Sequence, residues 1–200
     1  MFFIPEHYRG TVDHILITHG TIQDRIEKLA YDIARDYKDL TIHLMCVLKG
    51  GSAFFQDLCN AIRKFHDYSR CTQIPFTFDF IRVKSYEGTQ SSGEVTISGV
   101  SMEKLKGKHI LFVEDLIDTG LTMKKVFEKI TAEASPATIR VASLLEKRTE
   151  RALAIGFKGD YVGFSIPDKF IIGYNMDFNE AYRDMMHIGV INEEGIQKYK

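Results

Sequence analysis

The sequence lacks the cysteine and histidine patterns that build disulfide frameworks or zinc sites, and it has no tryptophan. Its three cysteines, Cys46, Cys59 and Cys71, are an odd number and form no C-x-x-C pair. The seven histidines form no H-x-x-x-H pair, so we expect no zinc site. Reduced thiols of this kind are typical of the cytoplasm, where we expect the protein to be located.

An excess of either charge is also absent. The 200 residues include 26 basic and 27 acidic side chains, a formal net charge of −1, so there is no overall attraction to nucleic acid or to an anionic membrane. No apolar run approaches the ~20 residues of a membrane-spanning helix. Pro5 and Glu6 come too early for a signal peptide. We therefore expect small-molecule partners, with neither nucleic acid nor membrane among them.

Three common enzyme motifs are missing: G-x-S-x-G, a complete Walker A string and G-x-G-x-x-G. The sequence therefore shows none of the usual signatures of serine hydrolases, P-loop NTPases or dinucleotide-dependent oxidoreductases. The chain does have a hydrophobic content of 44%, which is enough for one domain with a sizeable core. Two independent domains are not expected.

The stretch from His109 to Thr122, HILFVEDLIDTGLT, combines an apolar run with two carboxylates and a turn of small residues. Residues 110–113 predict a strand buried on both faces. Glu114 and Asp115 follow at its carboxyl end, where open α/β sheets bind their ligands. The turn then leads into a helix, and a helix start with free N–H groups and nearby hydroxyls is an anion site. Carboxylates beside an anion site suggest a sugar phosphate held with Mg²⁺.

A plain turn is the alternative interpretation of this stretch, with Asp118 or Thr119 capping the helix. It does not explain why Glu114 and Asp115 end a buried strand, because ions are costly there unless they are used or paired. We therefore favour a phosphate site.

Apolar runs and amphipathic segments alternate along the chain. A helical pattern begins near Thr21, its expected N-cap. Residues 41–48 form an apolar run, followed by two glycines and a helix from near Ser52, and residues 138–147 form another such run. Repeated βα units predict an α/β fold, with a twisted parallel sheet flanked by helices.

The remaining segments predict shorter elements. Residues 75–86 form a strand, and residues 95–97 return as the second strand of a hairpin. Residues 87–94 between them fit a surface hairpin or an active-site lid equally well. A short helical turn is expected from Asp177 to Arg183. Short strands are expected at residues 161–164, 171–174 and 187–191.

Two lysines directly follow predicted strands. Lys49 and Lys147 should therefore project over the same sheet edge as Glu114 and Asp115. Taken singly, each lysine would be an ordinary solvated side chain. Their shared position favours a role at this edge.

The string VEDLIDTGLT resembles the ribose-phosphate-binding motif of type I phosphoribosyltransferases. The rest of the chain resembles the hypoxanthine-guanine phosphoribosyltransferases of animals, in the family's order from residue 2 to about 200. The matching strings are FFIPEHY, CVLKGGSAFF, DFIRVKSYEGTQSSGE, VASLLEKRT, VGFSIPDKF and IIGYNMDFNEAYRDMMHIGVINEEG.

The resemblance implies a Mg²⁺-dependent purine-salvage transferase. Such an enzyme moves the 5-phosphoribosyl group from 5-phosphoribosyl-1-pyrophosphate to N9 of hypoxanthine or guanine, giving IMP or GMP and pyrophosphate. The resemblance also implies one domain over residues 1–200. Its core would span about 21–165, and a small hood would form from about 1–20 and 166–200. Because members of the family form dimers and tetramers, the resemblance also implies a homodimer or homotetramer.

The resemblance places the sugar phosphate on the VEDLIDTGLT motif. Backbone N–H groups and hydroxyls would hold the 5′-phosphate, and Glu114 and Asp115 would accept from the ribose hydroxyls. Asp118 would lie near purine N7 as the general base. The full set is Glu114, Asp115, Leu116, Ile117, Asp118, Thr119, Gly120, Leu121 and Thr122.

The base site implied by the resemblance centres on Lys147. Its ammonium has only donors, so it would bind the 6-oxo group and reject the amino group of adenine. Phe170 would stack on the base, while Lys169 and Ile171 would offer main-chain groups. Asp177 belongs to the same site and is the expected Mg²⁺ ligand.

The pyrophosphate would bind at Lys49 and Gly50, where the family has a cis non-proline peptide, with Arg183 adding positive charge. Ser85 and Tyr86 match a lid that closes over the reacting centre. If the transition state resembles a ribosyl cation, closure would exclude water and suppress hydrolysis.

Two residues depart from the family pattern. Leu121 stands where animal enzymes usually have lysine, so we expect weaker attraction of the phosphate. Glu146 beside Lys147 could disturb the base pocket.

Two other functions are compatible with the resemblance. One is a transferase with shifted base preference, including xanthine. The other is a catalytically weak paralogue that binds nucleotide, which is opposed by the presence of Asp118, Lys147, Asp177 and Arg183.

Overall fold

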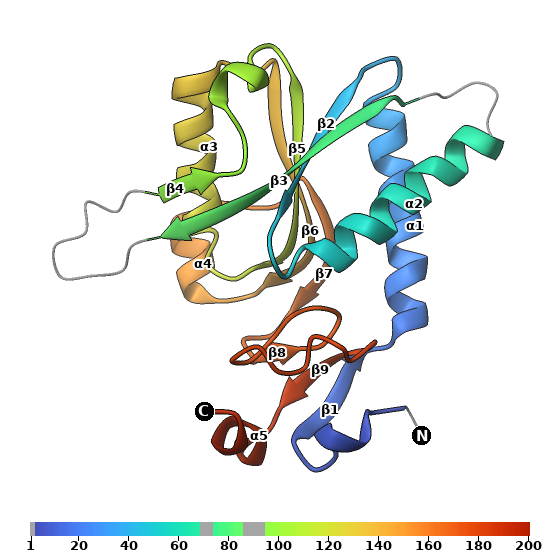
Figure 1. Cartoon of the computed structure of the whole chain (residues 1–200), viewed down its shortest axis with the longest axis vertical. Coiled ribbons are helices and arrows are strands. Elements are labelled where there is room, and N and C mark those ends of the chain that lie inside the picture. Colours follow the sequence, from blue (N-terminus) through green and yellow to red (C-terminus); the bar gives the residue numbers. More distant parts are fainter. Residues whose placement is uncertain (1–2, 69–73, 86–94) are drawn as a thin grey trace, which may run out of the picture.

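A six-stranded sheet forms the centre of the molecule (Figure 1). The computed structural model describes residues 3–68, 74–85 and 95–200. The strand order is β4-β3-β2-β5-β6-β7, and every pair is parallel except β3 with β4. The α/β prediction is confirmed. The strands are β2 (Ile42–Val47), β3 (Phe76–Ser85), β4 (Val95–Ser98), β5 (His109–Ile117), β6 (Thr138–Lys147) and β7 (Tyr161–Ile166).

Helices cover both faces of this sheet. Leu111 and Val113 of β5 pack in one core cluster with α1 (His19–Asp36) and α2 (Ser52–Tyr68). Ile110 and Phe112 point the other way, into a cluster with α3 (Leu121–Ala134). Because successive side chains of a strand alternate between faces, a strand covered on both sides reads as an unbroken apolar run. Shorter helices are η1 (Glu6–Tyr8), η2 (Met102–Leu105), α4 (Glu150–Ile155) and α5 (Glu193–Lys198).

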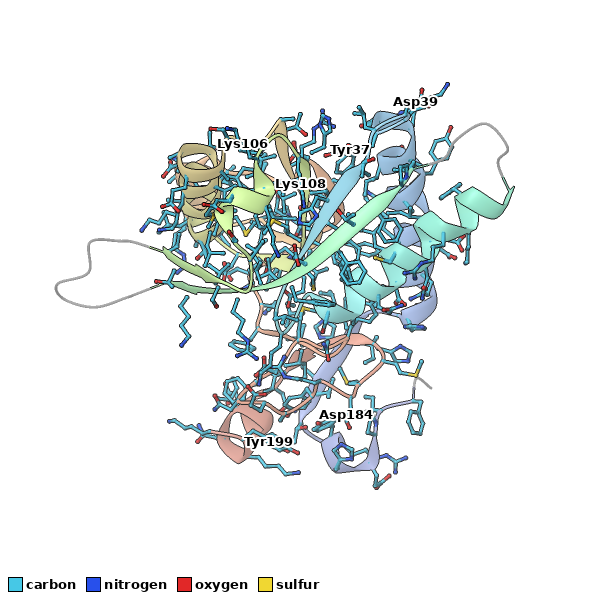
Figure 2. All side chains as sticks on the ribbon, turned by 45° about the horizontal axis from the view of Figure 1, so that its top comes forward. Tyr37, Asp39, Lys106, Lys108, Asp184 and Tyr199 are labelled. Atoms are coloured by element: carbon cyan, nitrogen blue, oxygen red, sulfur yellow. The ribbon has the colours of Figure 1, made fainter. Side chains whose placement is uncertain are left out.

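A second, smaller sheet lies at one end of the molecule, and with its connecting residues we call it the hood. It contains β1 (Val12–Ile17), β9 (Ile188–Ile191) and β8 (Ile171–Ile172) in the order β1-β9-β8, all antiparallel. The pairing places segments from the two ends of the chain side by side (Figure 1). Tyr8 stacks on Tyr182 with ring centroids 4.3 Å apart. Asp184 and Tyr199 of the hood lie at the end opposite Tyr37 and Lys108 (Figure 2).

The hood rests on the amino ends of α1 and α2. Tyr174 donates a hydrogen bond of 2.5 Å from its hydroxyl to Asp57 Oδ2, and Gln23 donates to the same oxygen at 2.6 Å. The backbone N–H of His19 donates to Nδ1 of His187 at 3.0 Å. Hydrogen bonds to a charged group are the stronger kind, so these contacts fix the hood above the sheet edge.

Two predicted boundaries are wrong. Thr18, not Thr21, is the N-cap of α1, because its hydroxyl accepts from the backbone N–H of Thr21 at 3.4 Å. β5 does not end before Glu114, but continues alongside β6 to Ile117. Pairing with β2 stops at Val113, so the last residues of β5 have an open edge on that side.

The expected helical turn from Asp177 to Arg183 is also wrong. Asn179, Glu180 and Tyr182 have φ angles of 47°, 69° and 71°, and a right-handed helix requires negative φ. β8 is shorter than predicted because the next two residues, Gly173 and Tyr174, have positive φ angles of 88° and 50°. The predicted hairpin of residues 75–86 with 95–97 is confirmed in β3 and β4, while residues 87–94 lie outside the described part. Among the described residues, no helix is long and apolar enough to cross a membrane.

Candidate active site

Two adjoining cavities open at the carboxyl ends of β2, β5 and β6. The loop cavity, about 320 Å³, is lined by Val47, Leu48, Gly50, Val83, residues 114–120, Thr122 and Met123. The hood cavity, about 290 Å³, is lined by Lys49, Gly50, Asp115, Leu116, Asp118, Lys147, Phe170, Ile171, Met176, Asp177 and Arg183. Both cavities share Gly50, Asp115, Leu116 and Asp118, so they meet at these residues.

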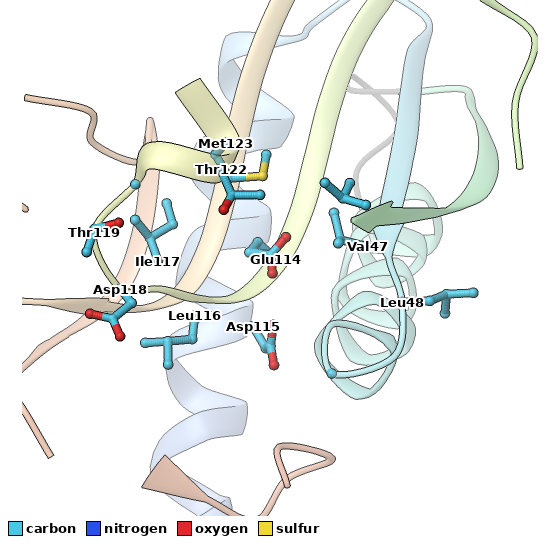
Figure 3. A pocket seen from close by; sticks show the side chains of 13 residues that line it. Val47, Leu48, Glu114, Asp115, Leu116, Ile117, Asp118, Thr119, Thr122 and Met123 are labelled. Atoms are coloured by element: carbon cyan, nitrogen blue, oxygen red, sulfur yellow. The ribbon is translucent and has the colours of Figure 1, made fainter. Parts of the chain in front are cut away.

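The loop cavity is closed by the turn between β5 and α3 (Figure 3). Gly120 is the N-cap of α3 with a φ of 82°, and the hydroxyl of Thr119 accepts from the backbone N–H of Leu121 at 3.3 Å. An added Cβ on Gly120 would lie 2.9 Å from Cβ of Phe157, so this position requires glycine on two counts. Of the two residues in the alternative interpretation, Thr119 does contact the helix start in this way, whereas the printed partner of Asp118 Oδ2 is Lys147. A helix has several free N–H groups at its start, so one contact with a hydroxyl still leaves donors for an anion.

Glu114 and Asp115 form a half-buried carboxyl pair on β5. Burial raises the pKa of Glu114 well above its usual range, and the neighbouring Asp115 raises it further. Burial also raises the pKa of Asp115. Glu114 Oε2 accepts no hydrogen bond within the described part of the chain. The free site therefore favours a proton on this pair, while hydroxyl donors from a ligand would favour its release.

Glycine at position 50 gives the Asp115 carboxylate its space. An added Cβ at Gly50 would overlap this carboxylate. The expected cis non-proline peptide is present immediately before, between Leu48 and Lys49. The loop after β2 therefore packs directly on the end of β5.

Lys147 lies at the centre of the charged groups in the hood cavity. Its ammonium is 3.2 Å from Asp118 Oδ2 and 3.3 Å from Asp168 Oδ1, and its side chain is only 10% exposed. Asp168 was not identified from the sequence, although it directly precedes Lys169 in the matching string VGFSIPDKF. Phe170 is half-exposed and packs edge-on against Phe178, with centroids 5.1 Å apart. A planar ligand could therefore reach both the ammonium and the ring face.

Arg183 brings a second cation to the hood cavity. Its guanidinium pairs with Asp177 Oδ1 at 2.7 Å and donates to the backbone carbonyl of Asn175 at 2.7 Å. Lys49, from the core, is 3.0 Å from Glu180 Oε2, and Arg183 Nε is 3.3 Å from the same oxygen. Glu180 was not identified from the sequence. The two cations on this side of the cavity are therefore each paired with a carboxylate of the chain.

Asp177, the residue expected to bind a metal ion, uses both carboxylate oxygens within the chain, and its Oδ1 pairs with Arg183. Its Oδ2 accepts from the backbone N–H of Glu180 at 2.8 Å. In the described ranges, no cluster of three or more His, Cys, Asp or Glu side chains could hold a metal by itself. Mg²⁺ does not need such a cluster, because it keeps several waters and shares one or two carboxylates with substrate phosphates. The residues present fit Mg²⁺ delivered with a phosphorylated ligand.

Several predicted site residues lie away from the cavities. Leu121 lines neither cavity and is 41% exposed at the start of α3. Lys169 is exposed, and its backbone N–H donates to the carbonyl of Pro167. Ser85 is the last residue of β3, and Tyr86 lies outside the described residues.

Glu146 turns away from the base pocket. Its Oε2 accepts from the backbone N–H of Gly159 at 3.0 Å. Gly159 is two residues after Phe157, which packs behind Gly120. Glu146 thus supports the segment that backs the turn before α3 and lines neither cavity.

Comparisons with known proteins agree with this geometry. A model of the phosphoribosyl transferase domain family matches residues 14–179. The chain is 46% identical over 201 residues to the hypoxanthine-guanine phosphoribosyltransferases of Rattus norvegicus and Homo sapiens, covering 100% of this chain and 90% of each relative. The hypoxanthine-guanine phosphoribosyltransferase of Sus scrofa is 45% identical with the same coverage. The similarity thus includes the hood as well as the core.

Proposed function

The chain belongs to the phosphoribosyl transferase family, and from this premise we propose that it is a purine-salvage enzyme acting on hypoxanthine and guanine. It transfers the 5-phosphoribosyl group from 5-phosphoribosyl-1-pyrophosphate to N9 of the base. The products are IMP or GMP and pyrophosphate. The relatives named above carry this base specificity in their names.

The observation that carries the proposal is the junction of the two cavities at Asp115 and Asp118. A sugar phosphate needs an anion site and hydroxyl acceptors, and the loop cavity has both. A purine needs a flat surface and donors for its 6-oxo group, and the hood cavity has Phe170 and Lys147. The bond to be formed joins these two ligands, so their sites must meet as these cavities do.

In the proposed reaction, the turn before α3 holds the 5′-phosphate, and Glu114 and Asp115 hold the ribose hydroxyls. The N9–C1′ bond forms as the bond from C1′ to the pyrophosphate oxygen breaks. Asp118 accepts a proton from the purine at N7. Lys147, which contacts Asp118 at 3.2 Å, donates to the 6-oxo oxygen and keeps the base oriented.

Pyrophosphate is proposed to leave along Lys49, Gly50 and Arg183, and the positive charges of Lys49 and Arg183 balance its negative charge. Asp177 would hold Mg²⁺, which when bound supplies positive charge to the pyrophosphate oxygens. The main chain of Lys169 and Ile171 would contact the base. Ser85 and Tyr86 would belong to a closing lid.

A direct test supplies labelled hypoxanthine, guanine, xanthine or adenine with 5-phosphoribosyl-1-pyrophosphate and Mg²⁺. We expect IMP and GMP, and no product from adenine, whose amino group would leave the Lys147 ammonium unpaired. No nucleotide from any base would refute the transferase. Product from adenine would refute the role of Lys147.

Assembly and location complete the proposal. The family resemblance supports a homodimer or homotetramer, which light scattering on the purified protein would measure. Cys46 and Cys59 are free and buried, which fits the reducing cytoplasm. The third thiol, Cys71, lies outside the described residues.

A further inference from the structure

One carboxylate of the chain bridges the two cations assigned to pyrophosphate. Lys49 Nζ is 3.0 Å and Arg183 Nε 3.3 Å from the same atom, Oε2 of Glu180. The lysine follows β2 in the core and the arginine belongs to the hood. Both cations line the hood cavity. A negatively charged oxygen of the protein therefore stands where the proposed function requires an oxygen of the leaving group.

The backbone holds Glu180 in this position in a conformation that is sterically unfavourable for a residue other than glycine. Phe178 and Ala181 exchange backbone hydrogen bonds of 3.2 and 3.0 Å, which close a two-residue turn over Asn179 and Glu180. Both central residues have positive φ, 47° and 69°. Asparagine followed by glycine is preferred in such turns, because glycine alone adopts positive φ without a steric penalty. A glutamate kept at the glycine position points to a use for its side chain.

The contacts of Glu180 can be exchanged for those of a ligand. Its side chain is 65% exposed and that of Lys49 is 59% exposed, so solvent weakens their attraction. Arg183 is 22% exposed and keeps its contacts with Asp177 and with the carbonyl of Asn175 when Glu180 leaves. The Arg183 guanidinium and the Lys49 ammonium lower the pKa of Glu180, so it is ionised at neutral pH.

We propose that Glu180 is an internal competitor of pyrophosphate, which holds Lys49 and Arg183 in the free enzyme and must yield them when the ligand binds. This rests on the proposed function of the same site. Pyrophosphate carries more charge than one carboxylate and wins the competition, but its net affinity is reduced by the displacement. As pyrophosphate departs, the Glu180 carboxylate pairs with Lys49 and Arg183 again, and this speeds product release.

The test is direct binding of pyrophosphate with Mg²⁺ to Glu180→Gln by calorimetry. Gln keeps the shape of the side chain and removes its charge. Exposed ion pairs are weak, so we expect affinity to rise about threefold to tenfold, with the gain shrinking as salt is added. Glu133→Gln is the matched control, because this exposed carboxylate pairs with Lys129 on α3 and should leave pyrophosphate affinity unchanged.

A second variant separates competition from a structural role. Glu180→Gly suits the turn better, so it should unfold at the same or a higher temperature while also tightening pyrophosphate binding. Both variants should release pyrophosphate more slowly and should lower the KM for 5-phosphoribosyl-1-pyrophosphate. If Glu180 only ordered the turn, Glu180→Gln would bind pyrophosphate equally or more weakly, and that result would overturn the proposal.

The assay of the unaltered enzyme keeps the two proposals distinct. Nucleotide formation by the unaltered enzyme, together with unchanged pyrophosphate affinity in Glu180→Gln, would overturn only the competitor role. Absence of nucleotide from every base would refute the transferase, whatever the effect of Glu180.

Discussion

At the residue scale, Asp118 and Asp168 share one ammonium but differ in position. Both contact Lys147, at 3.2 and 3.3 Å, yet only Asp118 lines the cavities. Asp118 Oδ1 is buried and has no hydrogen-bond partner in the described ranges, which suits its proposed role as the acceptor of the purine proton. Asp168 is half-exposed and acts on the lysine from outside the cavity.

Asp118→Asn should lower kcat at least tenfold while ligand binding is retained. An amide cannot accept the purine proton, and tenfold in rate corresponds to ~1.4 kcal/mol of barrier. Steady-state kinetics and calorimetric binding of GMP would measure the two effects. Asp168→Asn is the control and should change KM for the base more than kcat. Equal turnover in Asp118→Asn and the unaltered enzyme would remove Asp118 as base.

Glu114→Gln should stabilise the free protein increasingly as pH rises. Burial raises the pKa of Glu114, so above the ordinary range of a carboxyl the native state binds more protons than the unfolded state. The unfolding free energy of the unaltered protein then falls with pH, by about 1 kcal/mol per unit while the native proton is held. The Glu114→Gln side chain does not titrate, so the unfolding free energy of the variant should not show this fall with pH.

Urea unfolding of both proteins at several values from pH 5 to pH 8 would measure the difference. The variant should also lose sugar-phosphate binding, because an amide replaces a hydroxyl acceptor. Glu133→Gln, on an exposed helix face, should show neither effect. A constant stability difference across this range would mean that Glu114 is ionised throughout in the free protein.

At the scale of elements, the turn between β5 and α3 depends on the segment behind it. Gly120 faces Phe157, which stacks edge-on against Phe127 of α3 with centroids 5.1 Å apart. Glu146 holds that segment in place by accepting a hydrogen bond from the backbone N–H of Gly159. The anion site is therefore shaped from behind by residues that touch no ligand.

Gly120→Ala should weaken sugar-phosphate binding at least tenfold and lower stability. The added Cβ would meet Phe157 at 2.9 Å, and alanine disfavours a φ of 82°. Gly107→Ala is the matched control, because Gly107 has a φ of 70° but nothing lies within 4 Å of an added Cβ. The control should lose about 1 kcal/mol of stability and keep its KM. Equal KM values in the two variants would contradict the shaping of the turn by Phe157.

Much of the core could be predicted from apolar periodicity, and much of the hood could not. The run at residues 110–113 revealed β5 because helices cover both of its faces. β1, α4 and α5 were not identified. The burial of β1 alternates irregularly, and no residue of α4 is buried, so neither shows an apolar pattern. α5 has six residues and one buried glycine, too little for a helical stripe.

The site residues at the ends of the core strands could be predicted from the sequence, whereas the contacts made by the hood could not. Strand order brings Lys49, Glu114 and Lys147 to one sheet edge, and βα repetition is visible in the sequence. The contacts of Asp168 and Glu180 depend on how the hood folds over that edge. Glu180 also lies in a positive-φ turn that its sequence does not favour, because glycine is absent there.

At the scale of the whole molecule, the hood and the core must be held together for the base site to exist. Lys147 belongs to β6 and Phe170 to the hood, and the contact of Tyr174 with Asp57 is one of those that hold the hood on the core. Burial raises the pKa of Tyr174, so its hydroxyl remains a donor at neutral pH.

Tyr174→Phe should lower stability by about 1–3 kcal/mol and raise the KM for guanine. Removal of the hydroxyl leaves Asp57 with one donor fewer in a partly buried position. Tyr31→Phe is the control, because Tyr31 is 51% exposed on α1. Thermal unfolding and initial-rate kinetics would measure both effects. Lower stability with an unchanged KM would contradict the dependence of base binding on the seating of the hood.

The pairing of β1 with β9 also has a consequence for biosynthesis. β1 leaves the ribosome early, and its partner, residues 188–191, is synthesised after all the strands of the large sheet. The large sheet can assemble on the nascent chain while β1 waits unpaired. A chain that ends before residue 188 would keep every strand of the large sheet but would leave β1 without its partner strand.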